Sequence, residues 1–308
     1  MKKRVFITGA TGFIGRALTE KLCRDSAFVR ILTGDVKKAE NIFLNNHTIE
    51  IFDKDRNYDP VTVSMLMEES EVVINLAGAS IGAKRWNEDY KELIYTSRVG
   101  MTKLLVDAIN FCKKKPACFI NISGTGFYGS GNDTVLNETS PDGDDFLASL
   151  CKDWEAEALK ADYYGVRTVI MRTGLVLGKN SEALKKLLLS NKFLISTFHG
   201  SGKQWISWIH IADLINLFEF TFENESLTGI VNAVSPEPVT NKEFTNSLSK
   251  FRKTFLTLPI PGFMLKILAG EFAEYLITGQ RVIPEKALNA GFTFGLPDLK
   301  SALAEILD

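Results

Sequence analysis

Three glycines at the spacing G-x-x-G-x-x-G follow directly after a short apolar segment near the start of the chain. The segment 5–7 reads Val-Phe-Ile, and the glycines are Gly9, Gly12 and Gly15. In this arrangement the first glycine permits a tight turn, the second lets backbone N–H groups approach a pyrophosphate, and the third lets the next helix pack close to the strand. The N-terminus of that helix favours an anion. The pattern therefore predicts a dinucleotide site.

A glycine-rich turn can also end a strand for purely steric reasons, so the surrounding residues decide between the two interpretations. Residues 5–7 are typical of a buried parallel strand, and Ala17, Leu18 and Leu22 continue at helical spacing. This context favours the dinucleotide site. The loop residues expected to contact the cofactor are Gly9, Thr11, Gly12, Phe13, Ile14 and Gly15.

Composition excludes several other function classes. The 308 residues are 45% hydrophobic with a formal net charge of −1, and the isoelectric point is 6.4. This balance gives no electrostatic reason to expect nucleic acid or a membrane as partner. The basic start is followed by an apolar run that Gly9 and Gly12 break, so no signal peptide is expected. Four cysteines without a C-x-x-C pair and three histidines predict no metal site and reduced thiols in a cytoplasmic protein.

The first 175 residues alternate short apolar runs with longer helical patterns, as in an α/β protein with a parallel sheet. We expect a Rossmann-type doubly wound sheet over residues 1–178, with a returning segment near 205–235, and a smaller C-terminal α/β lobe over 179–308. Six of the nine prolines lie in that second part. Strands are predicted at 5–7, 29–33, 49–52, 72–78, 118–123 and 167–172, and long helices at 88–114 and 146–161.

In such a sheet, ligands bind beyond the carboxyl ends of the strands, so the residues that close each strand matter most. The small residues Ala77, Gly78 and Ala79 admit a ribose or a flat ring close to the backbone, so Leu76, Ala77 and Gly78 are expected at the cofactor; the alternative is a tight strand-to-helix turn. Arg172 closes the strand at 167–172 and is placed with them at the cofactor. Ser123 can hydrogen-bond a substrate carbonyl or hydroxyl, the alternative being a turn serine.

A set of motifs in order carries a family resemblance. They are 8–15 (TGATGFIG), 75–78 (NLAG), Ser123 with Tyr128-Gly129, 208–213 (WIHIAD), 97–99 (SRV), 172–178 (RTGLVLG), 200–205 (GSGKQW), 232–241 (NAVSPEPVTN), 279–284 (GQRVIP) and 290–294 (AGFTF). Together they resemble the extended short-chain dehydrogenases/reductases of the NAD(P)-dependent epimerase/dehydratase type. Within that superfamily the chain is similar to the "epimerase family protein" group 39U, whose C-terminal domain of unknown function corresponds to 250–300 here.

The resemblance implies a catalytic Tyr with a Lys four residues later, in which the Lys lowers the pKa of the Tyr hydroxyl. None of the seven tyrosines has such a Lys, and the helix at 146–161 contains no Tyr; the close relatives share this lack. The candidates for a substitute are Tyr128, Ser123, Thr125 and Lys152. Tyr128 either points its hydroxyl into the cleft or packs under its loop, and Lys152 either binds a ribose or lies in solvent.

Two further features concern ligand choice. Arg85 and Trp86 would bind an anionic, planar substrate through a guanidinium fork and a stacking face, unless they lie in an ordinary surface loop. After the second strand, Thr33 and Lys37 favour the 2′-phosphate of NADP(H), whereas Asp35 would favour NAD(H). Close relatives usually carry Arg at the place of Gly34, which implies NADP(H) for them; this chain lacks that Arg, so NADP(H) is favoured here by a phosphate pocket of Thr33, Lys37, Lys38 and Arg16.

The sequence thus leads to two functional hypotheses. The first is an NADP(H)-dependent epimerase/dehydratase-like oxidoreductase that acts on a small anionic or nucleotide-sugar-like substrate. The second is a non-catalytic NADPH-binding redox sensor or regulatory module. Whether the chain forms a homodimer is left open, because the apolar segment 256–265 can form either the core of the lobe or an interface between two copies.

Overall fold

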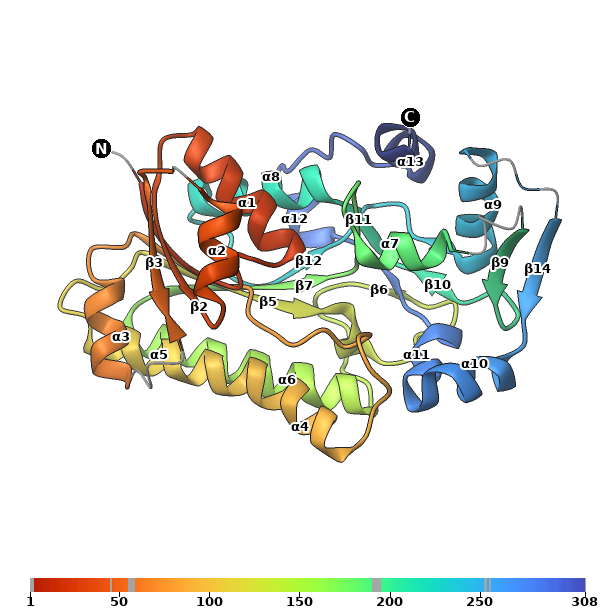
Figure 1. The fold of residues 1–308 in the computed structure, drawn as a ribbon, viewed down its shortest axis with the longest axis horizontal. Coiled ribbons are helices and arrows are strands. Elements are labelled where there is room, and N and C mark those ends of the chain that lie inside the picture. Colours follow the sequence, from red (N-terminus) through yellow and green to blue (C-terminus); the bar gives the residue numbers. More distant parts are fainter. Residues whose placement is uncertain are drawn as a thin grey trace.

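Seven parallel strands form the central sheet of the computed structural model, which describes residues 3–44, 46–54, 59–189, 195–251, 254 and 256–307 (Figure 1). The strand order is β12-β7-β5-β4-β1-β2-β3, and every neighbouring pair is parallel. The strands are β1 Arg4–Thr8, β2 Phe28–Thr33, β3 Ile49–Asp53, β4 Val72–Asn75, β5 Cys118–Gly124, β7 Arg167–Thr173 and β12 Gly229–Ala233. The predicted doubly wound Rossmann-type sheet is confirmed. Its order reverses between β1 and β4, which is where ligands bind in such folds.

Helices cover both faces of this sheet, as the alternation of side chains along β1 requires (Figure 1). Val5 and Ile7 pack into one core with α1 (Phe13–Arg24) and α8 (Ile211–Glu223). Phe6, between them, packs into the other core against α5 (Met101–Phe111). Helices α3 (Pro60–Met67) and α6 (Phe146–Leu159) also lie on this second side. Helix α2 spans Val36–Ile42. The sheet is therefore buried on both faces.

The long helix predicted over 88–114 is divided into three parts. Helix α4 (Glu88–Tyr95) continues through a π-helical turn at Thr96–Gly100 into α5. The run ends at Phe111, three residues earlier than predicted, because Cys112 is extended and Pro116 disfavours a helical conformation at the residue before it. Strand β4 also ends earlier than predicted, at Asn75.

The remaining strands form four two-stranded sheets in the C-terminal half and beside it. The pairs are β8 (Leu175–Leu177) with β11 (Trp208–His210), β9 (Ile195–His199) with β14 (Leu256–Ile260), β10 (Trp205–Ile206) with β13 (Val239–Thr240), and β6 (Val135–Leu136) with β15 (Arg281–Val282). The helices of this part are α7 Glu182–Leu187, α9 Asn241–Phe251, α10 Gly262–Ala269, α11 Ala273–Ile277, α12 Glu285–Asn289 and α13 Leu299–Leu307. Strand β12 returns from this part to the main sheet, where it pairs with β7.

Candidate functional site

The glycine loop after β1 lies closer to the end of β4 than any side chain would allow. Gly9 has a φ of +71°, and a Cβ built on it would lie 2.4 Å from the carbonyl oxygen of Leu76. A Cβ on Gly15 would lie 2.2 Å from the carbonyl oxygen of Gly9. Both glycines are therefore required by backbone contacts, as expected for a turn that leads directly into a tightly packed helix.

Gly12 differs from its two neighbours because its surroundings are open. A Cβ there would meet only the carbonyl oxygen of Gly9, at 3.3 Å. Gly12 is the N-cap of α1, and no side chain caps this helix. The first N–H groups of α1, at Phe13 and Ile14, are thus left for an external acceptor such as a phosphate.

A buried amide network shapes the segment Leu76–Gly78. The Thr8 hydroxyl donates to Asn75 Oδ1 at 2.6 Å, and Asn75 Nδ2 donates to the Thr102 hydroxyl at 2.8 Å and to Asn121 Oδ1 at 2.7 Å. Asn75 Oδ1 also accepts the backbone N–H of Ala77. The segment expected to face a ribose is therefore held by side chains from β1, β4, α5 and β5.

Arg98 is a site residue that the sequence reasoning missed. Its guanidinium donates to the carbonyl oxygens of Ala79 (2.9 Å) and Ile94 (3.0 Å), and Cζ would lie 3.0 Å from a Cβ on Gly78. It also lies over the ring of Trp154, and burial lowers its pKa. Arg98 stands in the π-helical turn, a feature frequent at functional sites. Its sequence signal was the motif 97–99 (SRV), which contributed to the family resemblance but was not assigned a role at the site.

At the end of β2, one carboxylate oxygen of the exposed Asp35 caps the helix that follows. Asp35 Oδ1 caps α2 by accepting the backbone N–H of Lys38 at 2.9 Å. Its own backbone N–H donates to the Thr33 hydroxyl. Lys37 and Lys38 are exposed on the first turn of α2. The end of β2 therefore presents basic side chains beside a carboxylate that is engaged by its own helix.

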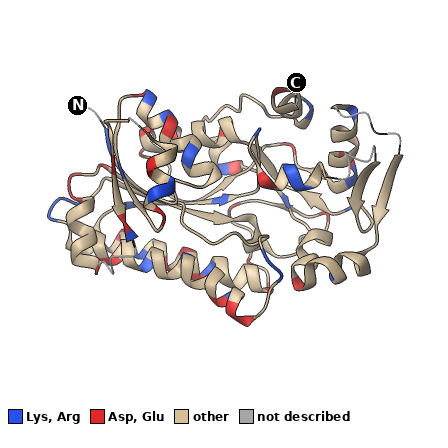
Figure 2. Ribbon diagram, in the orientation of Figure 1, with Lys and Arg blue, Asp and Glu red and all other residues tan. Residues whose placement is uncertain are grey.

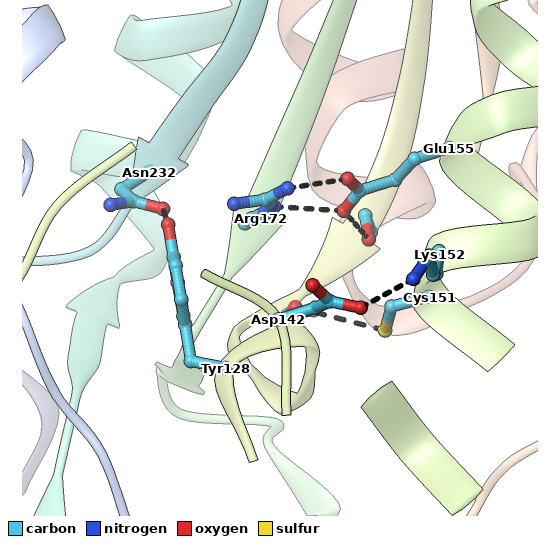
Figure 3. Close-up of polar contacts among 9 residues, drawn as sticks. Tyr128, Asp142, Cys151, Lys152, Glu155, Arg172 and Asn232 are labelled. Atoms are coloured by element: carbon cyan, nitrogen blue, oxygen red, sulfur yellow. Dashed lines mark hydrogen bonds and ion pairs between the residues drawn. The ribbon is translucent and has the colours of Figure 1, made fainter. Parts of the chain in front are cut away.

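Ser123, Glu155 and Arg172 form one buried network (Figure 3). The Ser123 hydroxyl donates to Glu155 Oε1 at 2.6 Å, and the Arg172 guanidinium binds both carboxylate oxygens of Glu155 at 2.9 and 2.7 Å. The Arg172 and Glu155 side chains are only 4% exposed, and Phe127 stacks on the guanidinium at 3.3 Å. Arg172, predicted to contact the cofactor, is placed in this interior ion pair, and the Ser123 hydroxyl is engaged by the same pair.

The two other predicted catalytic residues bind partners of their own, Asn232 for Tyr128 and Asp142 for Lys152 (Figure 3). The Tyr128 hydroxyl donates to Asn232 Oδ1 at 2.7 Å, and burial raises the pKa of Tyr128. Lys152 lies on the outer side of α6, where its side chain is 64% exposed and its Nζ pairs with Asp142 at 2.7 Å. The Arg172 guanidinium lies 4.9 Å from the centroid of the Tyr128 ring as well as on Glu155, so Ser123 and Tyr128 border the same ion pair, whereas Lys152 lies apart on the surface.

Two other residues of α6, spaced four apart, face the loop after β5 instead. A Cβ on Gly126 would lie 3.2 Å from Leu147 Cβ, and the Cys151 thiol lies 3.8 Å from the carbonyl oxygen of Gly124. This is the spacing of the superfamily's Tyr-Lys pair, so an apolar side chain and a thiol stand where that pair would be expected. Burial raises the pKa of Cys151 to about 11, which keeps the thiol protonated at neutral pH.

Trp86 is part of an aromatic wall near the start of α6. Its ring centroid lies 5.2 Å from Phe146, 5.5 Å from Phe272 and 5.2 Å from Tyr275, and its Nε1 donates to the carbonyl oxygen of Ile81. The indole is thus buried between the Rossmann part and the C-terminal part, and is not a surface-loop residue. Arg85 is exposed beside Gly270.

The burial of the thiols leads to a prediction about their reactivity. Burial raises the pKa of Cys112, Cys118 and Cys151 to about 11, whereas Cys23 is partly exposed. Because the thiolate is the nucleophile, iodoacetamide at mildly alkaline pH should label Cys23 and leave the other three intact in the native protein. Mass spectrometry of native and denatured samples measures this. Fast native labelling of Cys151 would contradict the closed packing described around it.

Comparison with known proteins agrees with this geometry. Residues 5–233 match the model of the NAD dependent epimerase/dehydratase family. The chain belongs to this family. Residues 260–306 match a domain of unknown function, DUF1731, so the C-terminal part of the predicted group 39U pattern is present as well. Among the residues that the structure describes there is no group of three or more His, Cys, Asp or Glu side chains able to hold a metal ion, and none of the described helices has the length and apolar content of a membrane span.

Individual relatives place the chain within this family. It is 37% identical to "Epimerase family protein SDR39U1 homolog, chloroplastic" of Arabidopsis thaliana, over 98% of this chain and 86% of the relative. It is similar to the crystal structure of human epimerase family protein SDR39U1 with NADPH, with a TM-score of 0.85, 29% identity and 99% of each chain covered. A nucleoside-diphosphate sugar epimerase from Corynebacterium glutamicum matches with a TM-score of 0.76 and 30% identity, over all of this chain and 58% of that one.

Proposed function

We propose that this chain binds NADP(H) at the carboxyl ends of β1, β2 and β4, and that it is an oxidoreductase of the epimerase/dehydratase type that works without a Tyr-Lys pair. The observation that carries the proposal is the loop 9–15, where Gly9 and Gly15 are fixed by backbone contacts while Gly12 stays open. Steric demand alone explains why positions 9 and 15 are glycines. It does not explain Gly12, where the close approach of a phosphate does.

The described residues fit such a cofactor. The uncapped N–H groups at the start of α1 would bind the pyrophosphate, and the segment Leu76–Gly78 would contact the ribose on the nicotinamide side. When bound, the cofactor supplies a nicotinamide that donates or accepts a hydride. Arg98 and Asn75 position the backbone that would receive it. The human relative of known structure contains NADPH, which supports the assignment.

The end of β2 favours NADP(H) over NAD(H). A free acidic side chain at this place selects NAD by accepting from the ribose hydroxyls. Here the carboxylate of Asp35 accepts from the backbone of its own helix. Lys37 and Lys38 are exposed beside it, so their charge is available to a 2′-phosphate.

A small anionic or nucleotide-sugar-like compound remains the proposed substrate class. The guanidinium of Arg85 is exposed and able to reach an anion. A further support is that a relative of known structure, 30% identical, is described as a nucleoside-diphosphate sugar epimerase. Trp86 would act here as part of the supporting wall rather than as a stacking face, because its indole is already surrounded by three aromatic rings.

One observation favours the second hypothesis, a non-catalytic NADPH-binding module. The hydroxyls of Ser123 and Tyr128 donate to Glu155 and Asn232, and Lys152 lies on the surface. Three of the four proton donors predicted from the sequence are thus engaged elsewhere; the fourth, Thr125, is not among these contacts. A protein of this kind would bind NADPH and signal the redox state to a partner without turnover.

Cofactor titration tests the proposal. NADPH should raise the melting temperature and bind at least tenfold more tightly than NADH, because ligand that binds only the native state stabilises it. Fluorescence of the bound cofactor and thermal shift provide the two readouts. Lys37→Ala should lower the affinity for NADPH and leave the affinity for NADH unchanged. Lys113→Ala, on the far side of the fold, is the control.

A folded protein that binds neither cofactor would overturn both hypotheses. The choice between them rests on transfer of deuterium from 4-deuterated NADPH to a panel of nucleotide sugars and small carbonyl compounds. Transfer that Arg85→Ala weakens supports the oxidoreductase. Tight binding without transfer supports the regulatory module.

A further inference from the structure

The end of the molecule formed by β9, β14 and α10 exposes an unusual amount of apolar side chain. Six large apolar residues of this apolar face are between 40 and 69% exposed. They are Leu256, Leu258, Phe263, Met264, Ile267 and Leu268. On α10 only Leu265 is buried, so the helix turns its larger apolar side outward. The alternative that the segment 256–265 forms the core of the lobe is therefore wrong for most of its side chains.

The apolar face is large enough for a protein interface. Taking about 200 Å² for a fully exposed large side chain, the six residues leave roughly 700 Å² of apolar surface. That is above the roughly 300–600 Å² found for the largest patch on a monomer. A standard interface buries about 800 Å² on each partner. A groove of about 310 Å³ lies beside α10 and provides a concave surface for shape-complementary packing. It is lined by Ile195, Leu258, Pro261 and Met264 among others.

The charge of the apolar face argues against a membrane or a charged partner. Strands β9 and β14 carry no Lys, Arg, Asp or Glu (Figure 2). The only charged side chain in 256–269 is Lys266, and Glu274 pairs with it at 3.2 Å. Helices that bind membranes carry several Lys and Arg along the polar side, whereas α10 has one Lys, which is paired with Glu274. Within the described residues of β9, β14 and α10, no unpaired charge is left for complementarity with an acidic or basic protein.

The free edge of β14 argues against an added peptide strand. Ile260 directs its backbone carbonyl toward β9, where it accepts the N–H of Gly200. Because backbone groups alternate along a strand, Pro259 directs its nitrogen to the outer edge, where it has no N–H to donate. This is the usual way in which an edge strand is protected from pairing. Association must therefore use side chains and not backbone hydrogen bonds.

We propose that the apolar face is covered by the same face of a second copy of this chain, in a two-fold symmetric dimer. A face without unpaired charge can meet itself across a two-fold axis with no like-charge contact, as an isologous interface requires. The segment that follows α10 carries Phe272 and Tyr275, which pack on Trp86. The dimer would thus brace the aromatic wall beside α6. The inference is independent of the cofactor proposal.

Sedimentation velocity and light scattering on the full chain, over a dilution series, test the dimer. The wild type should be dimeric, and Ile267→Lys should raise the dissociation constant at least tenfold. Ile267 is 67% exposed, so the substitution leaves the fold intact, which circular dichroism verifies. Tyr163→Lys is the matched control, because Tyr163 is 86% exposed and lies on the turn after α6; this variant should stay dimeric.

Three results would overturn the proposal. The first is a wild type that stays monomeric at all concentrations, and the second is an Ile267→Lys protein that dimerises as the wild type does. The third is co-sedimentation of the wild type with neutral phosphatidylcholine vesicles, which would show that lipid and not a second copy covers the apolar face.

Discussion

Replacing Gly15 with alanine should destabilise the folded protein by about 3 kcal/mol or more, with or without a bound cofactor. The new Cβ would lie 2.2 Å from the carbonyl oxygen of Gly9 and 2.7 Å from the Cα of Ala10. Both contacts are to backbone, so no side chain can rotate away, and α1 would have to move from the sheet. Urea denaturation followed by circular dichroism gives the free energy of unfolding.

The same substitution at Gly12 should separate cofactor binding from folding. Here the Cβ meets one atom at 3.3 Å, so the free energy of unfolding should change by no more than about 1 kcal/mol. Affinity for NADPH should fall at least tenfold, because the Cβ fills the space that a phosphate needs. Gly100→Ala is the control, since no atom lies within 4 Å of that position. A Gly12→Ala protein that binds NADPH like the wild type would show that the loop holds no phosphate.

Local patterns in the sequence were sufficient to predict the Rossmann part of the fold. The run from β1 through the glycines into α1 is encoded by neighbouring residues, because strand, turn and helix each depend on the next few positions. The alternation of strand and helix predicted a doubly wound parallel sheet, whereas the order of its strands became known only from the structure. The smaller strands β6, β10 and β15 were not predicted, since each has two residues and exists only through its partner.

The arrangement of the site could not be predicted to the same degree, because its contacts join residues far apart in the sequence. The Tyr128 hydroxyl meets Asn232, and Trp86 meets Tyr275 of α11. Nothing near Tyr128 in the sequence indicates that its hydroxyl has a buried acceptor. Spacing did indicate that α6 lacks a Tyr, but only the packed structure shows that Leu147 and Cys151 are the pair that faces the loop after β5.

The same reasoning explains why the contact between Arg172 and Glu155 was not predicted from the sequence. Arg172 closes a strand at the ligand edge of the sheet, so its position indicated a cofactor contact. Strand residues alternate in direction, however, and this one points into the interior, toward the third turn of α6. A buried guanidinium needs a carboxylate, and Glu155 supplies it in a bidentate pair. The pair fixes the Ser123 hydroxyl, and the buried Nη1 of Arg172 has no hydrogen-bond partner among the described residues, so the cofactor contact of Arg172 stays a prediction.

Removal of Glu155 should therefore be among the most destabilising single changes in the chain. Glu155→Ala leaves the Arg172 guanidinium buried without its anion, and breaking such a pair costs about 3–5 kcal/mol. Ser123→Ala removes only one hydrogen bond to the pair and should cost about 1 kcal/mol. The free energy of unfolding of each variant, measured in urea, gives the comparison.

Two controls distinguish a buried charge from simple loss of packing. Glu20→Ala breaks an exposed pair with Arg16 and should cost no more than about 0.5 kcal/mol. The double variant Glu155→Leu with Arg172→Met removes both charges and keeps the volume, so it should recover much of the stability that Glu155→Ala loses. If the double variant is as unstable as the single one, the loss arises from packing around α6 and not from the unpaired guanidinium. Recovery would instead show that β7 and α6 tolerate an apolar contact at this place, and that Arg172 is required for stability only while it is charged.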